Sequence, residues 1–152
     1  MTQQSATITY AKVVPCDRSI SKINDLTSIL NIDNAVAAKD LHATVVYSRS
    51  EVIGLDLIEI VRPLEATPVA FDLFDNGGKK CLVIKLKSDD LDMLHWMTRE
   101  MGASYDYIDY HPHITVSYDY NREPPADEVL DTIGIIRFNE FRLEPFDEYY
   151  GT

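Results

Sequence analysis

The sequence predicts an α+β domain with an internal duplication, and three observations support this prediction. First, segments that alternate apolar and polar β-formers are interleaved with segments whose apolar residues recur at helical spacing. Second, LHATVVYS at residues 41–48 is echoed 71 residues later by PHITVSYD at residues 112–119. Third, a length of 152 residues suits one domain and is short for two. We therefore expect residues 1–152 to form a single domain of two similar lobes, with antiparallel-rich sheets flanked by helices around a central cleft.

The first half of the chain is expected to contain a strand, a helix, a loop and a second strand. Residues 6–14, ATITYAKVV, alternate apolar and polar side chains and are rich in β-formers, which favours a strand. Residues 19–31 carry an apolar stripe at helical spacing, formed by Ile20, Ile23, Leu26, Ile29 and Leu30. Residues 31–40 break this pattern with Asp and Asn, which favour turns, and the strand at residues 41–48 follows.

A β-hairpin is expected in the middle of the chain. Residues 66–74, ATPVAFDLF, and residues 81–87, CLVIKLK, have the composition of strands, and Gly77 and Gly78 lie in the turn NGGKK between them. Residues 50–62, before the hairpin, fit either a helix or a strand.

After the hairpin, the order of helix, loop and strand is repeated. Ser88 is placed to cap a helix that runs to Met101, and Gly102 is placed to stop it. The side chains expected to face inward are Leu91, Leu94, Met97 and Met101. The aromatic loop SYDYIDYHP leads into the second motif strand. A short helix over about residues 125–133, begun by two prolines, and a strand at residues 135–146 complete the order.

The charge balance restricts the ligand. The chain has 14 Lys and Arg against 25 Asp and Glu, a net charge of -11, without a dense basic cluster. Because long RNA and DNA are bound largely through cations that neutralise phosphates, this surface would repel them, and a small ligand is expected. No apolar run approaches the roughly 18 residues of a membrane helix, and the start lacks a secretory signal, so we expect a cytoplasmic protein with no membrane contact.

Three residues with reactive side chains are given no chemical role. Cys16 and Cys81 are too few and too unpatterned for a disulfide framework and are expected to be small buried apolar residues. His95 lies beside Trp96 and off the apolar stripe of its helix, so it is expected to be exposed.

The repeated motif places a His and a Thr together twice. On a strand, residues two apart point to the same face, so His42 lies beside Thr44, and His113 beside Thr115. The residues expected to face the opposite way are Ala43, Val45 and Tyr47 in one copy and Ile114, Val116 and Tyr118 in the other. If a pseudo-twofold axis relates the halves, the two His and Thr pairs can face each other across one cleft. Two ordinary strands with surface or capping polar groups would give the same pattern.

Two such pairs suit the cleavage of a phosphodiester. Transesterification needs a base for the attacking hydroxyl and an acid for the departing oxygen, and His titrates close enough to neutrality for either task. The Thr hydroxyls can donate to the non-bridging phosphate oxygens. A ribose 2′-hydroxyl beside the scissile phosphate would supply an intramolecular nucleophile, which favours RNA-type linkages. Because the motif is nearly symmetric, it leaves open which His is the acid and which is the base.

A metal site is the alternative interpretation of this region. His111 and His113 are two residues apart, and Asp106 or Asp109 could supply a third ligand, whereas zinc takes three or four protein ligands. In that reading the paired Thr residues have no role, so we expect no metal and no cofactor.

At these residues the chain resembles the 2H phosphoesterase superfamily, whose mark is two His-x-Thr/Ser-x tetrads, here HATV (42–45) and HITV (113–116). With its opening ITYAKVV, its length and its acidic balance, it closely resembles the anti-CBASS cyclic oligonucleotide phosphodiesterases of T4-like phages. This resemblance implies the two-lobed 2H fold, metal-independent chemistry, catalysis by the His and Thr residues of both tetrads, cyclic di- or trinucleotide substrates such as cGAMP, and action in the cytoplasm of the infected host. It also implies a base-holding aromatic on the first strand, which falls on Tyr10.

Further substrate contacts are expected from aromatic and charged residues. The candidates for stacking on a base are Tyr10, Phe74, Tyr105, Tyr107 and Tyr110. Lys12 is a possible phosphate partner, and Glu140 or Glu144, on one face of the last strand with Phe138 and Arg142, could accept from a base amino group. The terminal DEYYGT could fold over the cleft as a lid. The base preference, ring size, final product and oligomeric state are left open.

The function expected from the sequence is therefore a phosphodiesterase that opens cyclic oligonucleotide second messengers at 3′-5′ linkages by 2′-hydroxyl attack. One alternative is a related enzyme that acts on linear RNA ends or 2′-5′ oligoadenylates. Another is a cyclic nucleotide sponge that binds the signal without turnover.

Overall fold

The structure is a computed structural model and describes residues 8–146. Its strands are β1 (Ile8–Pro15), β2 (Ala43–Ser48), β3 (Leu64–Asn76), β4 (Lys79–Lys87), β5 (His113–Ser117) and β6 (Ile136–Phe146). Its α-helices are α1 (Asp17–Ile29) and α2 (Asp89–Glu100), and 3-10 turns occur at Ala38–Asp40, Leu55–Leu57 and Asp127–Thr132. In the described part of the chain, no helix has the length and apolarity needed to span a membrane.

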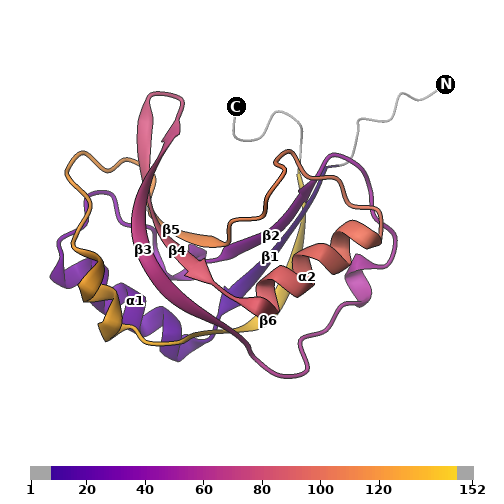
Figure 1. Cartoon of the computed structure of the whole chain (residues 1–152), viewed down its shortest axis with the longest axis horizontal. Helices are drawn as coiled ribbons and strands as arrows, with labels where there is room; N and C mark the ends of the chain where they lie inside the picture. Colours follow the sequence, from indigo (N-terminus) through magenta and orange to yellow (C-terminus); the bar gives the residue numbers. More distant parts are fainter. Residues whose placement is uncertain (1–7, 147–152) are drawn as a thin grey trace.

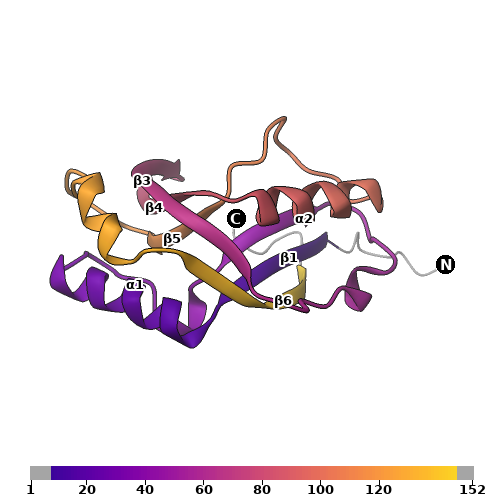
Figure 2. The same cartoon turned by 60° about the horizontal axis from the view of Figure 1, so that its bottom comes forward.

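The six strands form one closed antiparallel barrel in the order β1-β2-β5-β4-β3-β6. β1 lies between β2 and β6, and β4 lies between β3 and β5, so each half of the barrel has three strands. The halves join where β2 pairs with β5 and where β3 pairs with β6. Each half contains a strand, a helix and a motif strand in that order, and Figure 2 shows α1 and α2 on opposite sides of the strands. The predicted α+β class with two similar halves is confirmed.

Two segments differ from their predicted form. Residues 50–62 are neither a helix nor a strand but a loop with one 3-10 turn, which follows Gly54 in the left-handed region at φ 97°. A left-handed residue interrupts both a helix and a strand, so neither element continues through Gly54. The short helix expected over residues 125–133 is a 3-10 turn at Asp127–Thr132. The predicted hairpin is present, and its strands are longer than expected.

Helix α2 begins as predicted, but it is rotated relative to the predicted face. The Ser88 hydroxyl caps it by accepting from the backbone N–H of Leu91 at 3.0 Å. Leu91 and Leu94 are buried as expected, whereas Met97 is 41% exposed. His95 is 0% exposed, so its predicted exposure is wrong. The buried face continues through His95 because its imidazole finds a backbone partner, as described below.

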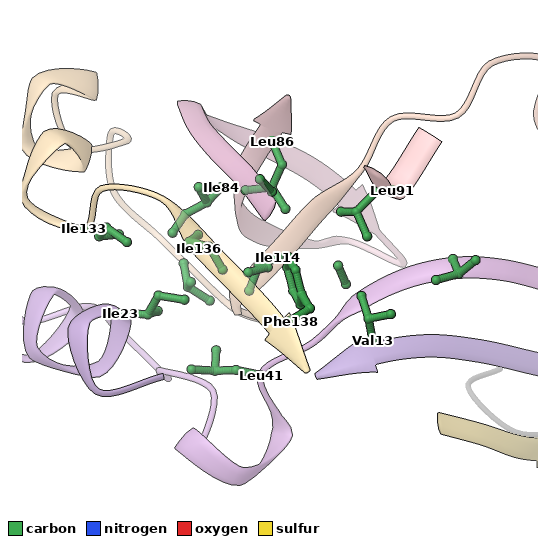
Figure 3. Packing of buried hydrophobic residues seen from close by; sticks show 14 of the residues in the cluster. Val13, Ile23, Leu41, Ile84, Leu86, Leu91, Ile114, Ile133, Ile136 and Phe138 are labelled. Carbon is green, nitrogen blue, oxygen red and sulfur yellow. The ribbon is translucent and has the colours of Figure 1, made fainter. Parts of the chain in front are cut away.

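The core joins the strands of the barrel to both helices, through Ile23 and Leu26 of α1 and Leu91 and Leu94 of α2. Side chains from both halves and from the turn at Asp127–Thr132 meet in one cluster, which Figure 3 shows around Ile114 and Phe138. Ala43 and Val45 of the first motif point into this cluster, as predicted. The His and Thr residues of the motifs alternate with these buried side chains and therefore point to the other side of the strands, which lie side by side in Figure 1.

Candidate active site

The two motifs meet at the point where β2 pairs with β5. The register pairs Ala43 with Ile114, and these residues are separated by the same 71 positions that separate the two motifs. Equivalent positions of the repeat thus lie opposite each other, so a local twofold axis passes between them.

All four predicted catalytic residues share one surface. Continuing the antiparallel register from that pair places His42 across from Thr115, and Thr44 across from His113. Side chains that are opposite in an antiparallel pair point to the same face. On this register the two pairs lie side by side on adjacent strands instead of facing each other across a cleft.

A β-bulge follows the Thr in each motif. The register of β1 with β2 skips Val45, and the register of β4 with β5 skips Val116. Each bulge residue and the residue after it are buried, so the next tyrosine returns to the site face. Tyr47 accordingly contacts Tyr10, with ring centroids 6.0 Å apart, and Tyr118 lines the pocket beside His42. The prediction that Tyr47 and Tyr118 face away from the histidines is wrong because strict alternation ends at a bulge.

Both imidazoles are oriented in the same way. Nδ1 of His42 lies 2.7 Å from the carbonyl oxygen of Asp40, and Nδ1 of His113 lies 2.9 Å from that of His111. In each case the acceptor belongs to the residue two positions earlier. A carbonyl oxygen only accepts, so Nδ1 carries the proton in both rings. The Nε2 atoms are therefore the ones available for proton transfer.

Tyr10 occupies the space beside His42. Its hydroxyl lies 2.7 Å from Nε2 of His42 and 2.8 Å from Oγ1 of Thr44. With neutral His42, Nε2 is an acceptor, so the phenol donates to it and the Thr44 hydroxyl can donate to the phenol oxygen. A single oxygen atom can therefore contact both Nε2 of His42 and Oγ1 of Thr44 at hydrogen-bond distance.

Two charged residues continue this side of the site. Nζ of Lys12 lies 2.8 Å from Oε1 of Glu144 and 5.8 Å from the centre of the Tyr10 ring. This contact lowers the pKa of the Glu144 carboxyl. Together with His42 they line the larger of the two pockets next to the motifs, about 710 Å³. This His42 pocket is formed by Tyr10, Lys12, Asn34, Ala35, Val36, Ala37, Asp40, His42, Tyr118 and Glu144.

His113 differs from His42 in having an aromatic neighbour, Phe74, and no tyrosine hydroxyl at its Nε2 within residues 8–146. Phe74 of β3 presents its ring edge-on to the imidazole, with centroids 5.2 Å apart and planes at 79°. Within residues 8–146, no side chain hydrogen-bonds to Nε2 of His113. The adjoining His113 pocket measures about 400 Å³ and is formed by Phe74, Asp75, Tyr105, Tyr107, Asp109, His111 and His113.

Burial lowers the pKa of both histidines. For His42, burial is the main cause; the hydrogen bond to Asp40 opposes it, and the charge of Lys12 adds to it. For His113, burial is again the main cause and the hydrogen bond to His111 opposes it. The charge of His113 also lowers the pKa of His42, which indicates that the two rings interact. Both are therefore mostly neutral near pH 7, as a general base must be.

Two predicted substrate contacts have other partners in the structure. The Tyr110 hydroxyl donates to the backbone carbonyl of Thr44 at 2.7 Å, and its ring stacks on His95. Glu140 is bound to Arg142 at 2.7 Å and lies outside both pockets. The β1–β6 register also has a bulge between Val14, which pairs with Glu140, and Pro15, which pairs with Phe138. Glu140 therefore does not share a face with the buried Phe138, contrary to the prediction. This geometry argues against a base contact by Tyr110 or Glu140.

The ligands of the alternative metal site are not assembled. Asp106 forms a two-point contact with the Arg49 guanidinium, at 2.9 and 2.8 Å. His111 and Asp109 line the His113 pocket. Within residues 8–146, no three His, Cys, Asp or Glu side chains are grouped closely enough to hold a metal ion. The predicted terminal lid, residues 147–152, lies outside the described residues.

Some pocket residues were not predicted from the sequence. Tyr118 could have been found, because both copies of the motif carry a Tyr three residues after the Thr. Asn34 belongs to the loop before the first motif, where its backbone has φ 52° and its side chain donates to the carbonyl of Asp119 at 2.8 Å. Nothing in the sequence pattern relates that loop to a segment 85 residues away.

Comparison with known structures gives the fold. Escherichia coli LigT complexed with phosphate matches with a TM-score of 0.60 and 19% identity, covering 96% of this chain and 92% of that one. LigT complexed with 3'-AMP matches with a TM-score of 0.57 and 18% identity, over 96% and 91% of the two chains. This chain therefore has the fold of the LigT structures, and its two His-x-Thr motifs lie where the adjacent strands β2 and β5 pair.

The sequence comparisons then give the family. The family described as Anti-CBASS protein Acb1 matches residues 7–151, and the chain belongs to this family. The member from Acinetobacter phage Ac42 is 32% identical over 111 residues, 73% of each chain. The member from Yersinia phage phiR1-RT is 31% identical over 131 residues, 80% of this chain and 82% of its own. The member from Enterobacteria phage T4 is 28% identical over 102 residues, 66% and 65% of the two chains.

Proposed function

We propose that this protein opens the cyclic di- and trinucleotide signals of bacterial CBASS defence by cutting their 3′-5′ linkages, in the cytoplasm of an infected host. The observation that carries the proposal is the single face shared by the two His and Thr pairs through the β2–β5 register. The anti-CBASS family supports the biological context, and its phage members support the site of action. The 2H fold supports a phosphodiester as the bond that is cut.

The proposed reaction is a transesterification between two imidazoles. Nε2 of one His takes the proton of a ribose 2′-hydroxyl, and the 2′ oxygen attacks the phosphorus on the neighbouring 3′ oxygen. The bond from phosphorus to the 5′ oxygen breaks, and the other His, protonated at the start, gives its proton to that oxygen. The products are a 2′,3′-cyclic phosphate and a 5′-hydroxyl, so no water is consumed in this step.

The Thr hydroxyls are proposed to stabilise the phosphorane-like transition state. Thr44 and Thr115 would donate to the non-bridging oxygens as negative charge increases on them. The position of the Tyr10 hydroxyl supports this geometry, because it bridges Nε2 of His42 and Oγ1 of Thr44 as a substrate oxygen would. Substrate binding would therefore displace the Tyr10 hydroxyl from this position.

The two pockets are proposed to hold the parts of the nucleotide on either side of the scissile phosphate. Phe74 in the His113 pocket and Tyr10 in the His42 pocket offer rings on which bases can stack, a contact worth about 1 to 3 kcal/mol per base. Lys12 would contact a phosphate, and Glu144 would accept from an exocyclic amino group. Nucleotide ligands in the LigT structures support a nucleotide-sized site in this fold.

The test is turnover of a defined panel: cyclic dinucleotides, cyclic trinucleotides, 2′-5′ oligoadenylates and linear RNA ending in a cyclic phosphate. Opening a ring by transesterification does not change its mass, so products must be separated by chromatography before mass analysis. Cyclic dinucleotides should give a linear isomer and then mononucleotide 2′,3′-cyclic phosphates. In ¹⁸O water, those products should carry no label.

Other outcomes would support the alternatives. Selective turnover of 2′-5′ oligomers or RNA ends would replace the cyclic substrate with a linear one. Release of an unaltered ring, with unchanged retention time, would establish a sponge.

His42→Ala and His113→Ala should each lower kcat by about 10² to 10⁴ while keeping the melting temperature, and turnover should survive dialysis against a chelator. Normal activity in either Ala variant would refute the assignment.

A further inference from the structure

A buried histidine holds the bulge of the first motif. His95 of α2 is fully buried, and its Nδ1 lies 2.7 Å from the carbonyl oxygen of Val45. The carbonyl only accepts, so Nδ1 carries the proton and donates it. Val45 is the bulge residue that directly follows the proposed catalytic Thr44. The imidazole of His95 therefore contacts the backbone of the motif directly after Thr44.

A tyrosine holds the adjacent carbonyl. The hydroxyl of Tyr110 donates to the carbonyl oxygen of Thr44 at 2.7 Å. Its ring stacks face to face on His95, with centroids 4.1 Å apart and planes at 3°. Tyr105 packs edge-on against the same imidazole at 4.6 Å. Two consecutive carbonyls of β2, those of Thr44 and Val45, are thus bound by two side chains that are packed against each other.

The second motif shows why such donors are needed. A bulge interrupts the ladder of strand hydrogen bonds, and a buried carbonyl without a donor is costly. At the equivalent bulge residue, Val116, the carbonyl accepts from the backbone N–H of Val36 at 2.9 Å. A main-chain group thus provides in β5 what the side chain of His95 provides in β2. A side-chain substitution can remove the donor to the Val45 carbonyl, whereas it cannot remove the backbone N–H that donates to the Val116 carbonyl.

We propose that His95 and Tyr110 are a positioning pair, which fixes the bulge at Thr44 and Val45 and so sets the direction in which His42 and Thr44 face the substrate. Neither side chain touches the substrate in this role. A neutral His95 with its proton on Nδ1 suits this positioning role, since Nδ1 must remain a donor. Burial favours the neutral form by lowering the pKa of His95. Nε2 of His95 is buried without a hydrogen-bond partner in the described structure, as suits an unprotonated nitrogen among aromatic rings.

The first test is Tyr110→Phe, which removes one hydroxyl and keeps the stacked ring. Its matched control is Tyr120→Phe, which removes another buried Tyr hydroxyl that donates to a backbone carbonyl, that of Glu123, at 2.9 Å. Both variants should lose about 2 to 4 °C of melting temperature. Only Tyr110→Phe should lower kcat, by about 10- to 100-fold, with KM changed much less. Equal kcat values in the two variants would overturn the proposal.

The second test compares two residues of similar shape at position 95. His95→Asn keeps an N–H donor where Nδ1 stands, whereas His95→Leu removes it. His95→Leu should lower kcat by the same factor as Tyr110→Phe, and His95→Asn should restore most of it. If the two variants have equal kcat despite equal melting temperatures, the hydrogen bond to Val45 does not position the motif.

The kinetic readout rests on the proposed function, so a third measurement is independent of turnover. NMR titration of the His42 imidazole reports its contacts with Asp40 and Tyr10 without any substrate. In Tyr110→Phe the pKa of His42 should shift, while in Tyr120→Phe it should not. A shift in a protein that cleaves none of the nucleotides would keep the positioning role and reject the proposed reaction. An unchanged pKa of His42, together with unchanged kcat, would reject the positioning role itself.

Discussion

Ala43 and Ile114 lie directly opposite each other in the β2–β5 register, and they are the same position of the two repeats. Because each residue is the one between the His and the Thr of its motif, a twofold axis through this pair brings each His across from the Thr of the other copy. The polar groups therefore alternate around the axis. A phosphate above it could contact both hydroxyls while an imidazole stood on either side.

The symmetry ends with the neighbours of the motif residues. Nε2 of His42 is bound to the hydroxyl of Tyr10, whereas His113 meets the edge of the Phe74 ring. The charged pair of Lys12 with Glu144 lines the His42 pocket. These differences give the two histidines distinct surroundings, so substitutions near His42 and near His113 should have distinct effects.

The Thr hydroxyls should matter for the rate more than for stability. Thr44→Val and Thr115→Val replace each hydroxyl with a methyl of similar size. If each hydroxyl donates to the phosphate in the transition state, kcat should fall by about 10²-fold in either variant. Melting temperatures should stay within a few degrees, and KM should change little. A change confined to KM would show that the hydroxyls only bind the ground state.

The ring and the hydroxyl of Tyr10 should have separable effects. Tyr10→Phe keeps the ring for stacking, so KM should stay within about threefold, since base stacking requires only the aromatic face. Tyr10→Ala removes the ring and should raise KM by about 5- to 150-fold, the equivalent of 1 to 3 kcal/mol. Steady-state kinetics on one cyclic dinucleotide is sufficient. Similar KM values for the two variants would argue against stacking on this residue.

Lys12 and Glu144 should move the pKa of His42 in opposite directions. The charge of Lys12 lowers this pKa and that of Glu144 raises it. Lys12→Met should therefore raise the pKa of His42, and Glu144→Gln should lower it. NMR titration of the imidazole measures both, with His113 as the internal reference because neither charge is among the causes of its shift. Shifts of the same sign would contradict the assignment.

The pH dependence should differ between the free protein and the complex. The active form needs one neutral and one protonated His, and burial lowers the pKa of both. In the free protein this form is therefore most populated below the ordinary imidazole pKa of about 6.5, so kcat/KM should peak on the acidic side of that value. The phosphate charge of the substrate favours protonation, so the maximum of kcat should lie at higher pH. Profiles between about pH 5 and pH 8 would test this, and coinciding maxima would contradict it.

The family and the four motif residues could be found from the sequence because they rest on local chemistry. A His and a Thr two residues apart on a strand must share a face, and a motif that occurs twice indicates two equivalent strands. The hairpin, the cap at Ser88 and the stop at Gly102 were equally local, since each depends on a few adjacent residues.

The contacts around the motifs depend on distant segments. Val45 and Val116 look like ordinary strand residues, and only pairing with β1 and β4 makes them bulges. The position of Tyr118 in the His42 pocket follows from that shift in alternation. The predicted exposure of His95 was wrong because its partner, the carbonyl of Val45, lies 50 residues earlier in the chain.

The sequence by itself thus determined which side chains can transfer protons and which strands carry them, because residue type and spacing along one strand are sufficient for that. Only the tertiary structure decided how the two copies are placed relative to each other and which neighbours each one has. The reason is physical: strand register, bulges and the donors for freed carbonyls are set by pairing and burial between segments far apart in the chain.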